Sequence, residues 1–277
     1  MKTVLGESEV LTTSRISRVY HLKSLEKGLR LLETFSSEAP AMTLTELAQR
    51  CGYHLSTVQR LTATLCRLGY LKRDHQKRYH LGLKVVKLGF QLTQTISLKN
   101  FLSPYLHDLF GIVEESVNLF LPEGDEVVIV ERLEKQRILQ YFLRTGSSLP
   151  MYCTAAGKAI LSHKGEDEIE AYLKRVPLES FTSYTITDPH KLVEELELAR
   201  RRGYAINRQE LGLGACAIGT AILDKEGDPC GAISIASPLQ HFNMETVEKK
   251  FLGPLLETAR IGSEFMGFQG EKRGNGK

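Results

Sequence analysis

The pattern of apolar and polar positions is most regular between residues 43 and 65, where two short segments with helical periodicity lie on either side of a glycine. The apolar positions are Leu44, Leu47, Ala48 and Cys51 in the first segment and Val58, Leu61 and Leu65 in the second. This spacing predicts two amphipathic helices. Gly52 lies where a chain leaving the first helix needs a left-handed residue, and Ser56 lies where the second helix would have its N-cap.

The following residues change from helical to alternating periodicity. Leu68–Leu71 predicts one strand and Tyr79–Leu81 predicts a second, and the loop between them carries four basic residues. Residues 43–80 therefore predict a winged helix-turn-helix, a fold that places its second helix in a DNA groove. The alternative is a surface helix pair in a larger α/β enzyme, whose polar side chains are only solvated.

The outward positions of the second helix have the chemistry that a DNA major groove requires. They are Ser56, Thr57, Gln59, Arg60, Thr62 and Ala63. Short polar side chains and arginine are suited to base edges and phosphates. The predicted DNA-binding residues are Thr45, Ser56, Thr57, Gln59 and Arg60 in the helices and Arg73, Lys77 and Arg78 in the wing.

One further helix is predicted on each side of this motif. The first has apolar positions at Leu22, Leu25, Leu29, Leu32 and Phe35, and the second, starting near Gly82, has them at Val85, Leu88 and Leu92. Exposed leucines on the first helix would suit contact with a second copy of the chain. The predicted organisation is a loose arm at 1–19, a DNA-binding domain at 20–82, a linker helix at 83–97, a second domain at 98–268 and a disordered tail at 269–277.

The second half alternates between strand and helix patterns. Strands are predicted at 117–121, 126–131, 137–143, 218–223 and 231–236, and helices at 101–113, 154–163, 166–174, 191–202 and 244–265. Pro122–Asp125 predicts a hairpin turn, and Asp188 with Pro189 predicts a helix N-terminus. Short antiparallel strands beside helices predict an α+β fold.

The net charge of +3 is unevenly distributed along the chain. Residues 1–95 contain 15 Lys and Arg against 7 Asp and Glu, a net charge of +8, whereas residues 96–277 contain 21 against 26, a net charge of −5. The basic part coincides with the predicted winged helix, which indicates a polyanionic partner for that part. A solvated basic face would have the same composition.

Composition restricts the class of protein further. The chain is 42 % hydrophobic and 25 % charged, which is ordinary for a soluble globular protein. No apolar run approaches the roughly 18–20 residues that a membrane span needs, and Glu7 and Glu9 argue against a signal peptide. The five cysteines form no Cys-x-x-Cys pair, and the histidines show no metal-ligand spacing. We expect reduced thiols, a cytoplasmic location, no cofactor and no metal.

Several segments resemble the IclR family of bacterial transcription factors. They are residues 25–32, 44–65, 68–71 and 79–82 in the first half and residues 146–159, 202–205, 209–214 and 231–236 in the second. The resemblance covers the chain from about residue 22 to residue 267. It implies a GAF-like effector domain that binds a small metabolite. It also implies a homodimer or a tetramer, as a dimer of dimers, on double-stranded operator DNA near a catabolic operon.

The resemblance also implies where the effector binds. Carried over by position, the pocket residues are Thr154, Ala155, Ala156, Gly157, Asn207, Ala215, Ala217, Ser234 and Ala236, with Ile138 and Tyr141 on the apolar side. The segment 152–154 is similar to the branch that senses hydroxybenzoate-like aromatic acids. Ala217 stands where many members carry Ser or Cys, and Ala236 where many carry Ser. We therefore expect a small organic acid with much apolar surface.

The chemistry of these residues suggests how an acid would bind. A helix that starts at Thr154 would offer free backbone N–H groups and its dipole to a carboxylate. The alternative is that the small residues 155–157 only allow close packing of the helix on the sheet. Arg144 and Arg208 are candidate counter-ions, although each is also typical of a surface arginine.

Two other functions stay open from the sequence. Cys153 is the best candidate nucleophile for an enzyme that processes a small acid, but no histidine lies in a recognisable partner motif, and a buried inert thiol is the alternative. A scaffold that uses the winged helix for protein contacts is the second. The favoured hypothesis is a ligand-responsive regulator, not an enzyme. In it, effector binding tilts the linker helix at 84–92 and changes the spacing of the recognition helices across the dimer.

Overall fold

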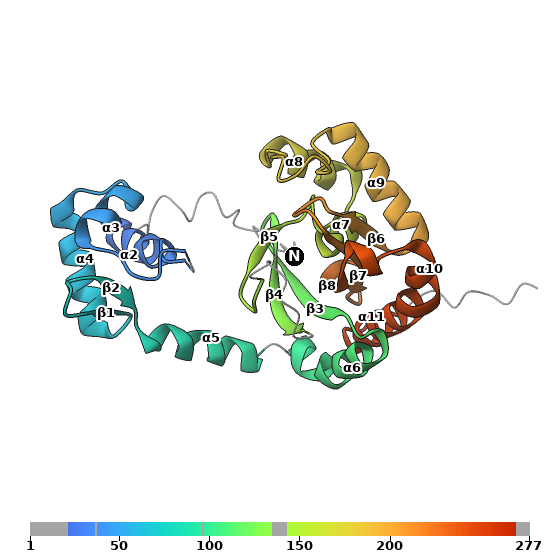
Figure 1. Cartoon of the computed structure of the whole chain (residues 1–277), viewed down its shortest axis with the longest axis horizontal. Coiled ribbons are helices and arrows are strands. Elements are labelled where there is room, and N and C mark those ends of the chain that lie inside the picture. Colours follow the sequence, from blue (N-terminus) through green and yellow to red (C-terminus); the bar gives the residue numbers. More distant parts are fainter. Residues whose placement is uncertain (1–21, 37, 96, 135–142, 270–277) are drawn as a thin grey trace, which may run out of the picture. The chain divides into compact units, whose positions relative to one another are not determined.

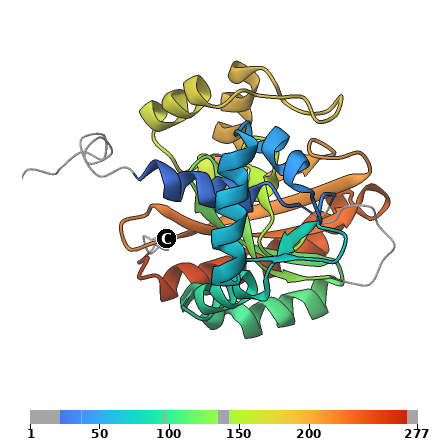
Figure 2. The same cartoon turned by 90° about the vertical axis from the view of Figure 1, so that its left-hand side faces the viewer.

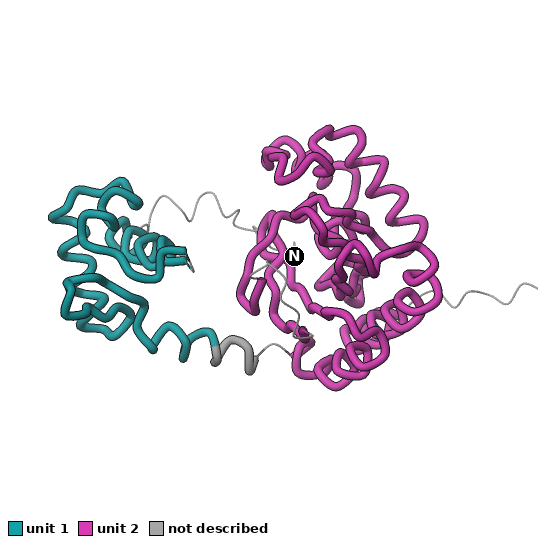
Figure 3. Tube along the Cα trace, viewed as in Figure 1, with its two compact units in different colours: residues 1–92 teal, residues 93–277 magenta. Residues whose placement is uncertain are grey.

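The computed structural model describes residues 22–36, 38–95, 97–134 and 143–269 (Figure 1). The predicted arm at 1–19, nearly all of the predicted strand at 137–143 and most of the predicted tail lie outside the described residues. The chain divides into two compact units, residues 1–92 and residues 93–277 (Figure 3). The division falls inside the helix that connects the units.

Unit 1 is a small helical domain with a two-stranded sheet. Its elements are α2 (Lys23–Glu33), α3 (Leu44–Cys51), α4 (Leu55–Leu68), β1 (Leu71–Arg73), β2 (Tyr79–Leu81) and α5 (Leu83–Thr95). The two strands pair antiparallel and form the predicted wing. The winged helix-turn-helix fold is therefore confirmed.

Local sequence accounts for the helix-turn-helix geometry. The Thr43 hydroxyl accepts a hydrogen bond from the Glu46 N–H, and the Glu46 carboxylate accepts one from the Thr43 N–H, so α3 begins with a capping box. Gly52 ends α3 with φ 65°, the left-handed conformation that glycine adopts without strain. Leu47 and Val58 are fully buried between the two helices, which holds them together.

Three details of unit 1 differ from the predictions. The N-cap of α4 is His54, whose side chain makes no cap hydrogen bond, so Ser56 lies inside the helix. Thr62 is buried and donates a hydrogen bond to the Gln59 carbonyl, so it does not face outward. Leu68 ends α4 and Gly69 follows it in the left-handed conformation, so the first wing strand starts only at Leu71. Helix α4 therefore begins earlier and ends later than the apolar spacing indicated, and Thr62 lies on its buried side.

The described residues of unit 2 form six strands and most of the helices. The elements are α6 (Ser97–Val113), β3 (Ser116–Glu123), β4 (Glu126–Leu133), β5 (Ser148–Pro150), α7 (Ala155–Leu161), α8 (Glu166–Arg175), α9 (Pro189–Arg202), β6 (Ala205–Arg208), β7 (Ala215–Leu223), β8 (Pro229–Pro238), η1 (Leu239–His241), α10 (Met244–Thr246), η2 (Val247–Phe251) and α11 (Leu252–Phe265). No helix in the described ranges has both the length and the apolar character needed to cross a bilayer.

The strands form one antiparallel sheet in the order β5-β4-β3-β8-β7-β6. Helices α6 and α11 cover one face, where Leu102, Leu106 and Leu255 pack on the strands. Helix α7, with α8 and α9 outside it, covers the other face (Figures 1 and 2). This layered arrangement confirms the predicted α+β class.

Several boundaries in unit 2 differ from the predictions. The strands β5 and β6 were not predicted, because each has only three or four residues and no clear alternation. Helix α6 starts at Ser97, four residues before the predicted start. The predicted closing helix spans the right residues but contains a π-helical stretch at Val247–Phe251. The predicted hairpin turn and the Asp188 cap of α9 are confirmed.

Candidate DNA-binding surface and ligand cavity

Helix α4 carries four of the eight predicted DNA-binding residues. Ser56, Gln59 and Arg60 are exposed, and Thr57 is half-buried. Thr45 is exposed on the neighbouring helix α3. Thr57 and Arg60 also border an apolar groove beside α2, so they lie at the edge of the exposed face. The helix therefore presents hydroxyl, amide and guanidinium groups on one surface.

The wing is organised by one carboxylate. Asp74 accepts hydrogen bonds from the backbone N–H of Gln76 and of Arg78, both at 2.9 Å, and lies 2.7 Å from Nε2 of His80. The hydrogen bond with His80 is the main reason that the pKa of Asp74 lies below its usual value. Lys77 is exposed at the tip with φ 63°. The acidic residue of this basic loop thus holds the turn that presents Lys77.

The two wing arginines lie in different environments. Arg73 is exposed, with its guanidinium 5.5 Å from the centre of the Tyr79 ring. Arg78 is half-buried and donates hydrogen bonds to the Ala41 carbonyl at 2.7 Å and to the Glu46 carboxylate at 3.4 Å. Arg78 therefore ties the wing to the start of α3, a role that the sequence did not indicate.

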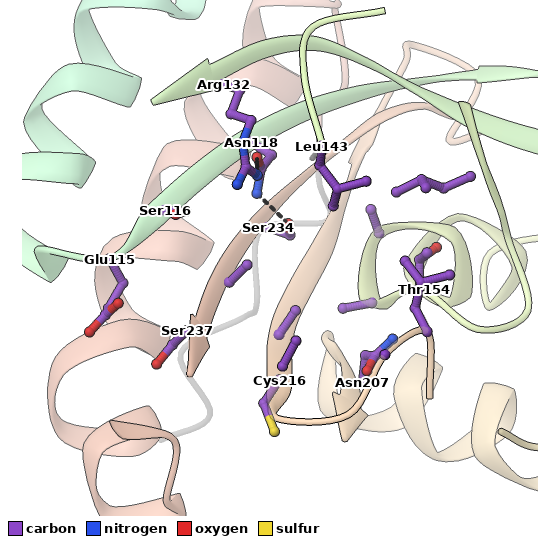
Figure 4. Close-up of a pocket in the computed structure, with 18 of the residues that line it drawn as sticks. Glu115, Ser116, Asn118, Arg132, Leu143, Thr154, Asn207, Cys216, Ser234 and Ser237 are labelled. Atoms are coloured by element: carbon purple, nitrogen blue, oxygen red, sulfur yellow. Dashed lines mark hydrogen bonds between the residues drawn. The ribbon is translucent and has the colours of Figure 1, made fainter. Parts of the chain in front are cut away.

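A cavity of about 140 Å³ lies on the face of the unit 2 sheet that α7 covers (Figure 4). Its lining includes eight of the eleven predicted effector residues: Thr154, Ala155, Ala156, Asn207, Ala215, Ala217, Ser234 and Ala236. Ile138 and Tyr141 lie outside the described residues. The cavity volume is close to the ~150 Å³ of an apolar protein cavity that takes up benzene.

The sheet register explains why these residues meet. Directly opposed residues on neighbouring strands form two rows across the sheet: Arg132, Asn118, Ser234 and Gly219 in one, and Ser116, Ala236, Ala217 and Asn207 in the next. Side chains two residues apart on a strand point to the same face. Both rows therefore share one face, and all of these residues except Gly219 line the cavity.

The start of α7 closes the cavity on one side. The Thr154 hydroxyl accepts a hydrogen bond from the Gly157 N–H at 3.1 Å and donates one to the Pro150 carbonyl at 3.0 Å. Ala155 and Ala156 line the cavity, but the predicted Gly157 does not. A Cβ at Gly157 would lie 2.2 Å from the Cα of Met151, so this glycine serves close packing. Close packing therefore explains Gly157, whereas Ala155 and Ala156 stay candidates for ligand contact.

The basic group in the cavity is Arg132, not either predicted counter-ion. Arg144 and Arg208 are exposed and do not line the cavity, whereas the Arg132 side chain lines it and is only 10 % exposed. Arg132 Nη1 donates a hydrogen bond to Asn118 Oδ1 at 2.6 Å, and Asn118 Nδ2 donates to Ser234 Oγ at 3.4 Å. These three side chains lie together in Figure 4.

A buried ion pair joins α7 to the segment that follows β6. Lys158, on α7, is 1 % exposed and its Nζ lies 2.6 Å from Glu210 Oε1. The Glu210 N–H donates to Asn207 Oδ1 at 3.1 Å, and Asn207 Nδ2 donates to the Cys153 carbonyl. Burial raises the pKa of Glu210, while Lys158 opposes this change. Lys158 is therefore held in the interior of unit 2 by Glu210.

Cys153 does not have the surroundings of a nucleophile. Its side chain is fully buried, and burial followed by the charge of Glu210 raises the pKa of the thiol to about 12. The thiol donates a hydrogen bond to the Pro150 carbonyl, at 4.0 Å. Because the thiolate is the reactive form, a thiol with this pKa is unreactive at neutral pH. Among the described residues, no cluster of His, Cys, Asp and Glu could hold a metal ion.

Two protein-family models match the sequence of this chain. The model of the bacterial transcriptional regulator IclR C-terminal domain matches residues 90–263, and the model of the IclR helix-turn-helix domain matches residues 24–75. This chain belongs to the IclR family. It is therefore a DNA-binding transcriptional regulator of the ligand-responsive type, as predicted from its sequence.

Individual relatives support the same assignment over most of the chain. The HTH-type transcriptional regulator KipR of Bacillus subtilis is 33 % identical over 214 residues, which is 77 % of this chain and 85 % of KipR. The crystal structure of IclR from Thermotoga maritima matches with a TM-score of 0.72 and 29 % identity, and covers 90 % of this chain and 100 % of that one. An IclR homologue from Microbacterium hydrocarbonoxydans, solved with 4-hydroxybenzoate, matches with a TM-score of 0.75 and 28 % identity, and covers 88 % and 98 %.

Sequence reasoning missed several residues that line the cavity in this IclR-family chain. They are Glu115, Ser116, Asn118, Phe120, Arg132, Glu134, Leu143, Leu149, Leu211, Gly212, Gly214, Cys216, Ser237 and Pro238. A usable signal was the alternation of Ser116, Asn118 and Phe120, which puts two polar residues on a strand face that is otherwise buried. Arg132 had no such signal, because its place depends on the register between β3 and β4.

Proposed function

We propose that this IclR-family regulator controls a catabolic operon by binding operator DNA through unit 1 and a small organic acid through unit 2. The observation that carries the proposal is the cavity on the α7 face of the sheet. The family's predicted ligand residues gather around that cavity. The DNA-binding domain would comprise residues 20–82, the linker helix residues 83–97 and the effector domain residues 98–268.

The size and lining of the cavity support a compact effector with much apolar surface. Phe120, Leu149 and Leu211 line it together with several alanines. At about 140 Å³ it would hold one aromatic ring or a short branched chain. The solved homologue that contains 4-hydroxybenzoate supports a small aromatic acid as the first candidate class.

Operator contacts would come from the exposed polar face of α4 and from the wing. Thr45, Ser56, Thr57, Gln59 and Arg60 would enter or border the major groove, and Arg73 and Lys77 would hold phosphates. Arg78 would contribute mainly by fixing the wing, because its guanidinium already binds Ala41 and Glu46. The net charge of +8 on residues 1–95 supports DNA binding by this part of the chain.

Self-association would use the apolar surface of unit 1. Leu22, Leu25 and Leu29 are more than half exposed at α2, and Leu83 and Val86 are 82 % and 66 % exposed on α5. Exposed large apolar side chains of this kind are typical of an interface between subunits. A homodimer or a dimer of dimers would place two recognition helices on successive half-sites of the operator.

The enzyme alternative centred on Cys153 lacks support. Its thiol is buried and has a raised pKa, and the relatives that match this chain are regulators. We propose that the chain is not an enzyme and that it works in the cytoplasm, where its DNA target lies. Effector binding would act by favouring one orientation of α5, which requires that the effector bind one state more tightly than the other.

Fluorescence anisotropy of the full-length protein on DNA from upstream of its own coding region would test the proposal. Random DNA of the same length is the control, and both are measured over a salt series. We expect tight binding that prefers the upstream DNA and weakens steeply with salt. Equal and weak binding to both DNAs would contradict operator binding at that site.

A further inference from the structure

We infer that Arg132 recognises the carboxylate of the effector and that Glu134 is a displaceable counter-ion which occupies Arg132 until the acid enters. This inference rests on the proposed function, because it deepens the ligand class of the same cavity. Arg132 is the one Lys or Arg among the described residues that lines the cavity. With its side chain 10 % exposed, it is a nearly buried charge that needs a compensating anion.

The local geometry presents Arg132 as a prepared carboxylate site. Its Nη1 donates to Asn118 Oδ1 at 2.6 Å, and Asn118 is held in turn by Ser234 at 3.4 Å. These residues are directly opposed on β4, β3 and β8, so the sheet itself fixes the guanidinium (Figure 4). A planar, fixed guanidinium fork matches a carboxylate with two parallel hydrogen bonds.

Glu134 now occupies the other side of that fork. Its carboxylate lies 2.9 Å from Arg132 Nη2 and 3.4 Å from Arg132 Nε. Unlike Arg132, Glu134 is 46 % exposed and lies just beyond the end of β4. Its carboxylate can therefore return to water at little cost when another anion replaces it. The exchange leaves the charge around Arg132 unchanged, so it avoids the penalty of burying an unpaired ion.

The remaining lining distinguishes an acid from a base. Glu115, the other carboxylate that lines the cavity, lies 3.0 Å from Nδ1 of His241 and is itself nearly buried. Leu143 and Phe120 add apolar surface to the lining of the cavity. The ligand class that fits is a monocarboxylate with an apolar body. Its carboxylate would bind Arg132, and its body would lie over the alanines of the adjacent row.

The test compares acids with their uncharged amides on the full-length protein by isothermal titration calorimetry. The probes are benzoate, 4-hydroxybenzoate, isobutyrate and pyruvate, each with its amide, and benzylamine as a cation. We expect at least one acid to bind the natural protein at least 10-fold more tightly than its amide does. In Arg132→Gln the Kd of that acid should rise about 10- to 100-fold while the Kd of the amide changes little.

Two further variants, with different expected effects on the Kd of the acid, make the test more specific. Glu134→Gln removes the competing anion from an exposed position and should lower the Kd of the acid several-fold. Arg144→Gln removes an exposed arginine of the same unit and should leave the Kd unchanged. Thermal unfolding of each variant shows whether it is folded. The inference is overturned if no acid of the panel binds, if an amide or benzylamine binds as tightly as the acids, or if Arg132→Gln keeps the acid preference.

Operator binding separates this inference from the proposed function. Without acid, Arg132→Gln and Glu134→Gln should bind upstream DNA like the natural protein, because neither residue lies in unit 1. Loss of the acid preference with intact operator binding supports the inference. Acid binding that does not depend on Arg132, with intact operator binding, overturns this inference but not the proposed function. Absence of operator binding by the natural protein contradicts the proposed function instead.

Discussion

The two units of this regulator use charge in opposite ways. In unit 1 the positive residues of α4 and the wing are mostly exposed, and their effect depends on number and sign. In unit 2 the charges that matter lie in two ion pairs: Lys158–Glu210, which is buried, and Arg132–Glu134, in which Arg132 is nearly buried and Glu134 is 46 % exposed. Salt and single substitutions should therefore affect DNA binding gradually. In the effector domain, by contrast, one buried charge decides the architecture or the specificity.

The largest expected effect comes from breaking the buried pair in unit 2. Lys158→Met leaves Glu210 buried without its counter-ion, which should lower the free energy of unfolding of this unit at pH 7 by about 3–5 kcal/mol. The double variant Lys158→Met with Glu210→Gln should recover part of that loss. Chemical denaturation measures both. Equal stability of the single variant and the natural protein would show that the pair is solvated.

The pH dependence of the same variant has a defined sign. Burial raises the pKa of Glu210, and without Lys158 the pKa should rise further. A carboxyl whose pKa is higher in the folded than in the unfolded state stabilises the fold most at low pH and loses that contribution as pH rises. The Lys158→Met variant should therefore regain stability as pH falls from 7 towards 5. A loss of stability over that range would contradict the assignment.

The second prediction concerns packing at the start of α7. In Gly157→Ala the new Cβ would lie 2.2 Å from Met151 Cα and 2.4 Å from Met151 O, so the helix must shift, at a cost of about 3 kcal/mol. Gly111→Ala is the matched control, because a Cβ there meets nothing within 4 Å and lies in a helix. We expect that control to be neutral or up to about 1 kcal/mol more stable. Thermal unfolding of both variants checks the difference.

The sequence predicted unit 1 more fully than the cavity of unit 2. The helix-turn-helix was predictable because its signals are local: Thr43, Gly52 and the apolar positions all act within a few residues. The cavity is assembled from strands that are far apart in the sequence, such as β3 and β8, which pair in the sheet. Only the family resemblance therefore indicated its residues. Arg132 was missed because an arginine on a strand is normally exposed, and here the pairing with Asn118 turns it into the cavity.

The third prediction returns to unit 1. Arg60→Ala should weaken operator binding by about 1–3 kcal/mol and leave the fold intact, because Arg60 is exposed on α4. Arg201→Ala, an exposed arginine of unit 2, is the control and should leave the operator affinity unchanged. Anisotropy on operator and random DNA measures both. Unchanged affinity in Arg60→Ala would remove this residue from the DNA surface.

The smallest expected effect concerns the tip of the wing. Lys77→Ala should weaken binding to operator and random DNA alike, and should lower the slope of log K against log salt by about one, the signature of one lost phosphate contact. The exposed position of Lys77 at the turn held by Asp74 motivates this expectation. A change confined to the operator would instead indicate that Lys77 contacts a base.

The central claim is that an acid bound in unit 2 changes how unit 1 binds DNA. The most direct test measures the operator Kd of the full-length protein with and without a saturating concentration of the tightest acid from the calorimetric panel. We expect a change of about fivefold or more in the natural protein and none in Arg132→Gln at the same acid concentration. An unchanged operator Kd, with the acid shown by calorimetry to be bound, would contradict it.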